Sequence, residues 1–316
     1  MNQARNSSVL AAAVVAVLLS ACGSETPPAP TPAPAPVTTT APPPAAPTQP
    51  TLDALIAGTH RAEADKARDG ARHPQATLEF FRIQPTDVVL EVTPGAGWWT
   101  DILAPYLRAQ GRYIALVWDD TLPDAPKYYA DNNAKLKAKF DANPALYDKA
   151  ETARFNPKAP GDFAPAGSVD LVVTFRNTHG WVNDGSADAM YGGFFRALKP
   201  GGRLGVEQHR ANAGADPSES SKKGYVSEEA VIAIAEKAGF KLVGKSEINA
   251  NPKDTKDYEK GVWTLPPVLT LGETDKDKYL AIGESDRMTL LFEKPAAVVA
   301  ADPAGAQDGF EKKDGE

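Results

Sequence analysis

The segment "VVLEVTPGAGWWTDILAPYL", residues 88–107, contains three patterns in succession. It opens with a short apolar run, 88–92, which is typical of a buried strand. A turn with two glycines follows, and apolar residues then return at the i, i+3, i+4, i+7 spacing of a helix starting at Trp98. Pro105 is expected to kink or shorten that helix. The segment therefore predicts a strand, a glycine loop and a helix in direct succession.

The rest of the folded part repeats this alternation of strand and helix. A helix–turn–helix with a break at His73–Pro74 is predicted before the first strand. Apolar runs bounded by turn residues predict further strands at 113–117, 152–155, 169–175, 199–209 (a turn, then a strand), 241–247 and 286–294. Helical patterns lie at 127–140, 190–198 and 227–240, the last with Ser227 as N-cap and Gly239 as C-cap. Such alternation predicts an α/β fold with a doubly wound, mostly parallel sheet.

Residues 1–21 have the pattern of a secretory signal peptide. Arg5 is basic, and the apolar run 9–19 is shorter than the roughly 20 residues that span a bilayer. The run ends in Leu19-Ser20-Ala21-Cys22, which resembles the lipobox of bacterial lipoproteins. That resemblance implies cleavage before Cys22 and attachment of lipid, palmitate included, to its thiol. The alternative is an ordinary signal peptide followed by an unrelated cysteine.

Composition divides the remaining chain into three parts. Residues 22–50 are almost all Pro, Ala and Thr, which favours an extended linker. Residues 51–295 are long enough for one α/β domain, and 296–316 are small and polar, as in a disordered tail. We therefore expect a lipid-anchored domain in the periplasm of a bacterial envelope, and by analogy Gly23 is compatible with the outer membrane.

Charge and cysteine content exclude several classes of function. The net charge is −7 and no basic block is present, which argues against a nucleic-acid partner. The single cysteine, Cys22, leaves the exported domain without a disulfide, a thiolate nucleophile or a cysteine-based zinc site. We predict no metal site.

Three motifs resemble class I S-adenosylmethionine-dependent methyltransferases. "LEVTPGAGWWT" (90–100) resembles their motif I, "SVDLVVTF" (168–175) the region of their fourth strand, and "FFRALKPGGRL" (194–204) the turn before their fifth. Two further segments, 61–74 and 284–295, resemble exported proteins described as methyltransferases. The resemblance implies a Rossmann-like methyltransferase fold with seven strands, the last one antiparallel. A nicotinamide-binding fold is disfavoured because the third glycine of that fingerprint is Thr100 here.

The resemblance also implies a set of residues that bind S-adenosylmethionine. In motif I these are Glu91, Gly95 and Gly97, and the first glycine of the family is replaced by Thr93, followed by Pro94. The acid that binds the ribose at the end of the second strand is missing in a simple alignment. Asp119 takes that role if the strand is two residues longer. On the adenine side Asn156 stands in the place of a carboxylate.

Candidates for the chemistry follow the fourth and fifth strands. His179 is the candidate base because imidazole titrates near neutrality, and Asn177 is placed to orient an acceptor. The alternative is an ordinary loop histidine. His209 and Glu207 also face the expected pocket, or else form a structural ion pair with Arg210 or Arg203.

Other candidates lie on the far walls of the expected pocket. Trp98 either covers the cofactor or packs in the core, where Trp99 is expected. Arg72 and His73 are weaker candidates on the substrate side, in a charge run that is otherwise a solvated helix face. The long connection 249–284 is expected to shape the acceptor site.

The sequence thus predicts a methyltransferase that uses S-adenosylmethionine to methylate a small molecule. The competing hypothesis is a non-catalytic envelope protein that uses the same fold to bind another small ligand.

Overall fold

The computed structural model describes residues 49–296. The predicted signal peptide, Cys22, almost all of the linker and the tail lie outside these residues and stay predictions. Within residues 49–296, every helix is too short or too polar to cross a membrane.

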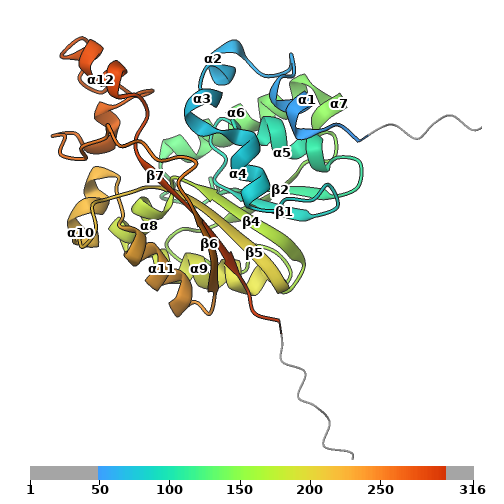
Figure 1. Ribbon diagram of the computed structural model, residues 1–316. Coiled ribbons are helices and arrows are strands. Elements are labelled where there is room, and N and C mark those ends of the chain that lie inside the picture. The colour runs from blue at the N-terminus through green and yellow to red at the C-terminus, as the bar shows by residue number, and fades with distance from the viewer. Residues whose placement is uncertain (1–48, 297–316) are drawn as a thin grey trace, which may run out of the picture. The chain divides into compact units, whose positions relative to one another are not determined.

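A seven-stranded sheet forms the centre of the described domain (Figure 1). Its order is β3-β2-β1-β4-β5-β7-β6. Strands β3, β2, β1, β4 and β5 pair in parallel, while β7 is antiparallel to both of its neighbours. The predicted doubly wound, mostly parallel sheet with an antiparallel last strand is therefore confirmed. The strands are β1 (Val88–Val92), β2 (Arg112–Trp118), β3 (Glu151–Phe155), β4 (Val169–Phe175), β5 (Leu198–His209), β6 (Lys241–Ser246) and β7 (Arg287–Glu293).

Helices cover both faces of the sheet (Figure 1). Neighbouring strand residues point to opposite faces, so Val89 and Leu171 enter one apolar core while Leu90 and Val172 enter the other. One core is closed by α1 (Leu52–Ile56), α4 (Pro74–Phe80), α5 (Thr100–Leu107), α6 (Lys127–Ala142) and α7 (Pro144–Tyr147). The other is closed by α8 (Thr178–Asp184), α9 (Ala187–Ala197) and α11 (Glu228–Lys237).

Pro105 lies inside α5 without ending it. A proline has no N–H to donate to the carbonyl four residues earlier, which here belongs to Asp101. The Nε2 of His60 donates to that carbonyl instead, at 2.8 Å. This contact joins the N-terminal segment to the helix that follows the glycine loop.

The N-terminal segment differs in part from its prediction. The break at His73 is confirmed, because this residue has a left-handed backbone (φ 42°) between two helices. The two predicted helices are instead four short ones, α1 to α4, with α2 at Glu63–Lys66 and α3 at Asp69–Arg72. Arg61 supports this compact arrangement by donating to the carbonyl of Ile56 and to both carboxylate oxygens of Asp69, each at 2.7 Å.

Local turn chemistry agrees with the sequence elsewhere. The Oγ of Ser227 accepts from the N–H of Ala230, so the predicted N-cap of α11 is confirmed. The C-cap is Ala238, one residue earlier than the predicted Gly239, and Gly239 follows it with φ 104°.

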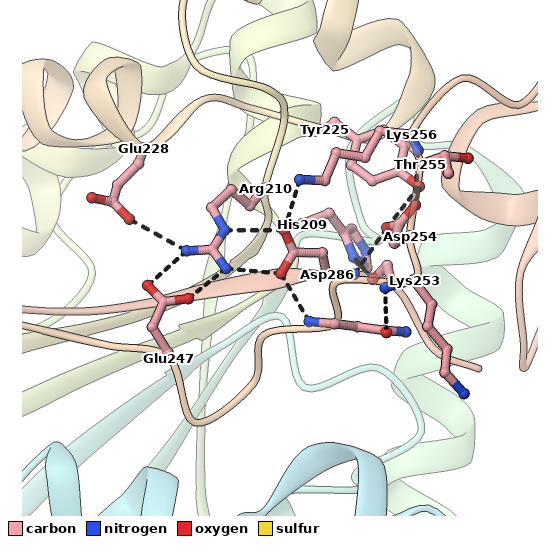
Figure 2. A network of polar contacts seen from close by, with 12 residues as sticks. His209, Arg210, Tyr225, Glu228, Glu247, Lys253, Asp254, Thr255, Lys256 and Asp286 are labelled. Atoms are coloured by element: carbon pink, nitrogen blue, oxygen red, sulfur yellow. Dashed lines mark hydrogen bonds and ion pairs between the residues drawn. The ribbon is translucent and has the colours of Figure 1, made fainter. Parts of the chain in front are cut away.

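The connection between β6 and β7 is tied down by an ionic network (Figure 2). It contains the short helices η2 (Gly261–Thr264) and α12 (Lys276–Ile282). Near its end, Asp286 accepts from Nε and Nη2 of Arg210 (3.1 and 2.8 Å) and from the N–H of Asn251 (2.9 Å). It also pairs with Lys256 at 2.8 Å. These contacts fix both ends of the connection against the end of β5.

The small helices α10 (Pro217–Ser220) and η1 (Ser221–Lys223) lie between β5 and α11 in the chain.

Candidate functional site

A cavity of 420 Å³, here called the central cavity, lies at the carboxyl ends of β1, β2, β4 and β5. Its other walls come from the N-terminal helices and from the connection between β6 and β7. In doubly wound sheets ligands bind outside the carboxyl ends of the strands, where the strand order reverses. The cavity occupies that position in this molecule.

The glycine loop after β1 forms one side of the central cavity. Gly95 (φ 61°) lines it, and apart from its two chain neighbours no residue within 49–296 has a heavy atom within 4 Å of the place where a Cβ would sit. Gly97 (φ 84°) does not line it, because its Cβ position faces Lys139 and Leu136 at 3.2–3.3 Å. The Oγ1 of Thr93 is buried in this loop and has no hydrogen-bond partner within residues 49–296. Gly95 therefore opens onto the cavity, whereas Gly97 packs the loop against α6.

Glu91 lines the cavity, but the protein's own hydroxyl groups hold its carboxyl group. Oε2 accepts from Oγ1 of Thr100 at 2.9 Å and from the hydroxyl of Tyr113 at 2.6 Å. Burial raises the pKa of Glu91 to about 7, although both hydrogen bonds act in the opposite direction. Glu91 is therefore a firmly oriented carboxyl group whose ionisation is opposed by burial.

The structure does not bring Asp119 and Asn156 to the central cavity. The carboxylate of Asp119 accepts from N–H and Oγ1 of Thr121, at 3.0 and 2.6 Å, and these bonds lower its pKa. Asn156 accepts from the N–H of Lys158 and lines a separate cavity of 230 Å³. Trp118 lines the central cavity at the end of β2 instead. The predicted ribose and adenine contacts stay predictions.

Two neighbouring tryptophans line the cavity after the glycine loop. The indole of Trp98 has the guanidinium groups of Arg61 and Arg72 against it, at 4.9 and 4.6 Å from the ring centroid. Trp99 is buried, as predicted, and stacks on Phe175 with ring centroids 4.1 Å apart. Trp98 thus links the N-terminal segment to the glycine loop, and Trp99 links the loop to β4.

Asn177 and His179 both lie at the cavity, close to the end of β4. The Nδ2 of Asn177 donates to the carbonyl of Val92 and to Oγ1 of Thr174, both at 3.1 Å. His179 has its Nδ1 within 3.3–3.5 Å of the side-chain amide of Gln208. Burial lowers the pKa of His179 to about 4, against the effect of Gln208. At neutral pH its imidazole is uncharged and can accept a proton.

His209 and Glu207, at the end of β5, have partners other than those expected. Glu207 pairs with Arg287 at 3.3 Å, so the expected ion pair with Arg210 or Arg203 is wrong. The Nδ1 of His209 lies 2.6 Å from Oγ of Ser285. Burial and the charge of Arg176 hold the pKa of His209 well below its usual value. Arg210 and Arg203 are occupied by Asp286 and Asp87 respectively.

Of the weaker candidates, Arg72 lines the cavity and His73 does not. His73 is exposed and contacts Asn249 at 3.3 Å. The connection 249–284 reaches the cavity through two short stretches, 262–263 and 266–268, and through Glu284. The connection therefore forms part of the cavity wall, and its predicted role in shaping an acceptor site stays a prediction.

Neither Arg68 nor Arg176 was predicted as a site residue from the sequence. Both line the cavity. One sequence feature would have pointed to Arg176: it is the first residue after the predicted strand 169–175, and ligand-binding residues of doubly wound sheets lie at such strand ends. Arg68 carries no such feature, because only the folded chain places it beside Glu284, 216 positions later.

The strand order, the reversed last strand and the cavity at the strand ends together define the class I methyltransferase fold. The described domain has this fold.

Comparisons with solved structures agree at the level of fold. The [4+2]-cyclase SpnF superposes with a TM-score of 0.52 at 14% identity, over 76% of this chain and 86% of its own. A methyltransferase from Aquifex aeolicus that depends on S-adenosylmethionine gives 0.47 at 16% identity, over 72% and 93% of the two chains. Geranyl diphosphate methyltransferase in complex with S-adenosylmethionine gives 0.49 at 12%, over 77% and 94%. No family model and no curated protein matches the sequence.

The residues present fit S-adenosylmethionine at one end of the cavity better than at the other. The open space at Gly95 and the unpartnered hydroxyl of Thr93 suit a polar ligand that approaches the loop closely. At the β2 end, the carboxylate of Asp119 is bound within its own turn, and aromatic Trp118 takes its place at the lining.

Proposed function

We propose that the protein is a methyltransferase that uses S-adenosylmethionine to methylate a small molecule. The observation that carries this proposal is the position of the 420 Å³ cavity, which opens directly at Gly95 in the loop after β1. The methyltransferase fold supports it as well. When bound, S-adenosylmethionine supplies the methyl group.

Side chains of this protein would then act in three ways. Gly95, Glu91 and Trp98 form the wall against which the cofactor is held. His179 lies at the cavity with an imidazole that is uncharged at neutral pH, and we assign it as the base for an acceptor that must lose a proton. Burial lowers its pKa and so makes it a weaker base than an exposed histidine, which suits an acceptor whose proton is easily lost. Asn177 fixes the ends of β1 and β4 relative to each other, which keeps the two reactants aligned.

Calorimetric titration of the full-length chain with S-adenosylmethionine and S-adenosylhomocysteine tests the proposal. We expect binding in the micromolar range that is lost in Gly95→Arg, because the new side chain would fill the cavity. Gly214→Arg is the matched control. Gly214 has a similar backbone (φ 71°) and open surroundings but lies outside the cavity, so binding should persist. Absence of heat with both ligands would refute the enzymatic function.

A second candidate is a non-catalytic protein that binds another small ligand in the same cavity. The placement of Asp119 favours it, since the carboxylate expected at the ribose is not at the cavity. If this candidate is correct, S-adenosylhomocysteine binds detectably neither to the wild type nor to Trp118→Ala, a variant at the β2 end of the cavity. A binding isotherm for the wild type that weakens in Trp118→Ala would exclude it.

We also propose that the chain is anchored in the bacterial envelope through Cys22, with the domain in the periplasm. The support is the sequence Leu19–Cys22 at the end of an apolar run. Replacement Cys22→Ser should move the protein from the membrane fraction to the soluble fraction. Unchanged retention in the membrane fraction would contradict lipidation.

A further inference from the structure

The central cavity contains a guanidinium group that the protein leaves without a partner. Arg176 lines the cavity directly after β4, and its side chain makes no hydrogen bond or ion pair with any residue in the range 49–296. Its Nε is buried. Buried charges are costly unless they are paired, so proteins rarely keep one that serves no purpose.

The backbone of Arg176 adds a second cost. Its φ is 63°, in the left-handed region that residues other than glycine seldom adopt. The conformation is fixed by the N–H of Arg176, which donates to the carbonyl of Glu207 at 2.7 Å. Strained backbone that persists in this way is concentrated at ligand-binding sites.

Two further arginines present free N–H groups at the same place. Arg68 and Arg72 each use Nε to bind one carboxylate oxygen of Glu284, at 2.7 and 3.3 Å. Their Nη2 atoms are buried and have no partner within the described residues. Arg72 is only 1% exposed and lines the cavity together with Arg68. Burial lowers the pKa of Arg72 to about 9, and the charge of Arg176 contributes to that shift.

The local charges do not balance. Arg287 joins these three arginines and pairs with Glu207 at 3.3 Å and with Glu284 at 3.0 Å. Four guanidinium groups against two carboxylates leave two positive charges. The remaining acids of the cavity are Asp65 and Glu91, and within residues 49–296 neither is paired with any of the four arginines. The excess positive charge lies at the part of the cavity lined by Arg68, Arg72 and Arg176.

We propose that Arg176, together with Arg72 and Arg68, forms a binding subsite for an oxyanion, a carboxylate or phosphate group, of the ligand that occupies the central cavity. The planar guanidinium fork matches both groups, because it offers two parallel N–H donors. The stacked rings of Trp99 and Phe175 line the same cavity and suit a flat apolar body attached to that anion. This inference does not require that the protein transfers a methyl group.

Titration of the full-length chain with malonate and with inorganic phosphate tests the subsite. We expect at least one of these anions to bind the wild type and to bind Arg176→Gln at least tenfold more weakly. Arg176→Lys keeps the charge without the fork and should lie between the two. Arg154→Gln removes the same charge from an exposed residue outside the cavity and should bind as the wild type does. Equal anion binding by wild type and Arg176→Gln, or none by the wild type, would overturn the proposal.

Thermal unfolding separates a binding role from a structural one. The bound anion should raise the melting temperature of the wild type and not that of Arg176→Gln. Without the anion, the variant should melt at or above the wild-type temperature, since it loses an unpaired buried charge. A clear drop would instead mark Arg176 as structural and count against the subsite.

A pair of nucleosides identifies the source of the oxyanion. S-adenosylhomocysteine carries a carboxylate, whereas methylthioadenosine does not. Weaker binding of the former alone in Arg176→Gln assigns the subsite to the cofactor's carboxylate. Loss of malonate or phosphate binding with both nucleosides unaffected assigns it to a second ligand. Failure of the wild type to bind either nucleoside, with anion binding intact, would refute the methyltransferase function and leave the subsite standing.

Discussion

Arg176 and Arg210 occupy equivalent positions, each directly after one of two neighbouring parallel strands, β4 and β5. Their surroundings are opposite. Arg210 donates to both carboxylate oxygens of Asp286 and of Glu247, as Figure 2 shows, and these bonds raise its pKa. The guanidinium of Arg176 has no such partner among residues 49–296, and burial lowers its pKa.

The difference teaches how residues at strand ends divide between structure and function. Both residues are arginines and each directly follows a strand, so neither property identifies the functional residue. The decisive property is whether the protein itself satisfies the side chain. Arg210 donates its N–H groups to carboxylates at both ends of the connection between β6 and β7, which forms a cavity wall. The N–H groups of Arg176 remain available to a ligand in the cavity.

The largest expected effect comes from removing the carboxylate of Asp286, which accepts two hydrogen bonds from Arg210. In Asp286→Ala, Arg210 and Lys256 lose a carboxylate that is only 6% exposed. Breaking a buried ion pair by removing one partner costs about 3–5 kcal/mol, and we expect a loss in that range. Urea unfolding of the full-length chain at pH 7 measures it. A loss of unfolding free energy below about 1 kcal/mol would mean that the ion pairs of Arg210 do not stabilise the fold, and the contrast with Arg176 would disappear.

A smaller effect, dependent on pH, is expected for the carboxylate beside the functional arginines. Burial opposes ionisation of Glu284, but Arg72, Arg287 and Arg68 outweigh it and lower the pKa to about 2. Because the folded-state pKa lies below the ordinary value of 4.5, the stabilisation is present above pH 4.5 and is lost as the pH falls toward 2. The contribution of ionised Glu284 to the free energy of unfolding at pH 7 is roughly 3 kcal/mol.

Glu284→Gln should remove this contribution. The variant should be less stable than the wild type at pH 7, and the difference should vanish near pH 2, as measured by urea unfolding at a series of pH values. Glu63→Gln, at an exposed residue of α2, is the control and should show no difference at any pH. A difference for Glu284→Gln that does not change with pH would show that its carboxylate is not what the arginines hold.

Much of the sheet could be predicted from the sequence because its signals are local. The bounds of β1 (88–92) and β4 (169–175) agree with the prediction at every residue. Both are mainly apolar runs between turn residues, interrupted only by Glu91 in β1 and by Asp170 and Thr174 in β4. Burial on both faces of the sheet favours such runs. The N-terminal helices were predicted less well, since their bends depend on contacts such as Arg68 with Glu284, which are distant in sequence.

The candidate site shows the same limit. The loop at Gly95 could be placed at the cavity from its motif, because strand, turn and helix follow one another directly. The position of Asp119 could not, since it depends on whether its carboxylate turns to the cavity or to Thr121 two residues on. The sequence places Arg176 directly after a predicted strand, but the unpaired state of its side chain appears only after every neighbour is in place.

The smallest expected effect comes from replacing Glu247, the second carboxylate that Arg210 binds. Glu247 accepts two hydrogen bonds from Arg210, at 2.8 and 2.7 Å, a geometry as good as that of Asp286. Its side chain is nevertheless 67% exposed, so water replaces most of what the pair contributes. We expect Glu247→Gln to cost less than about 1 kcal/mol in urea unfolding at pH 7.

Together with Asp286→Ala, this variant separates geometry from burial as the reason why Arg210 is structural. Both carboxylates bind the same guanidinium with similar distances, but Asp286 is far less exposed and also binds Lys256 and the N–H of Asn251. If burial decides, the two losses differ several-fold, and an unpaired buried arginine such as Arg176 is the group that most needs a ligand. Equal losses would show that hydrogen-bond geometry alone governs the stability of the pair, and burial would then no longer mark Arg176 as exceptional.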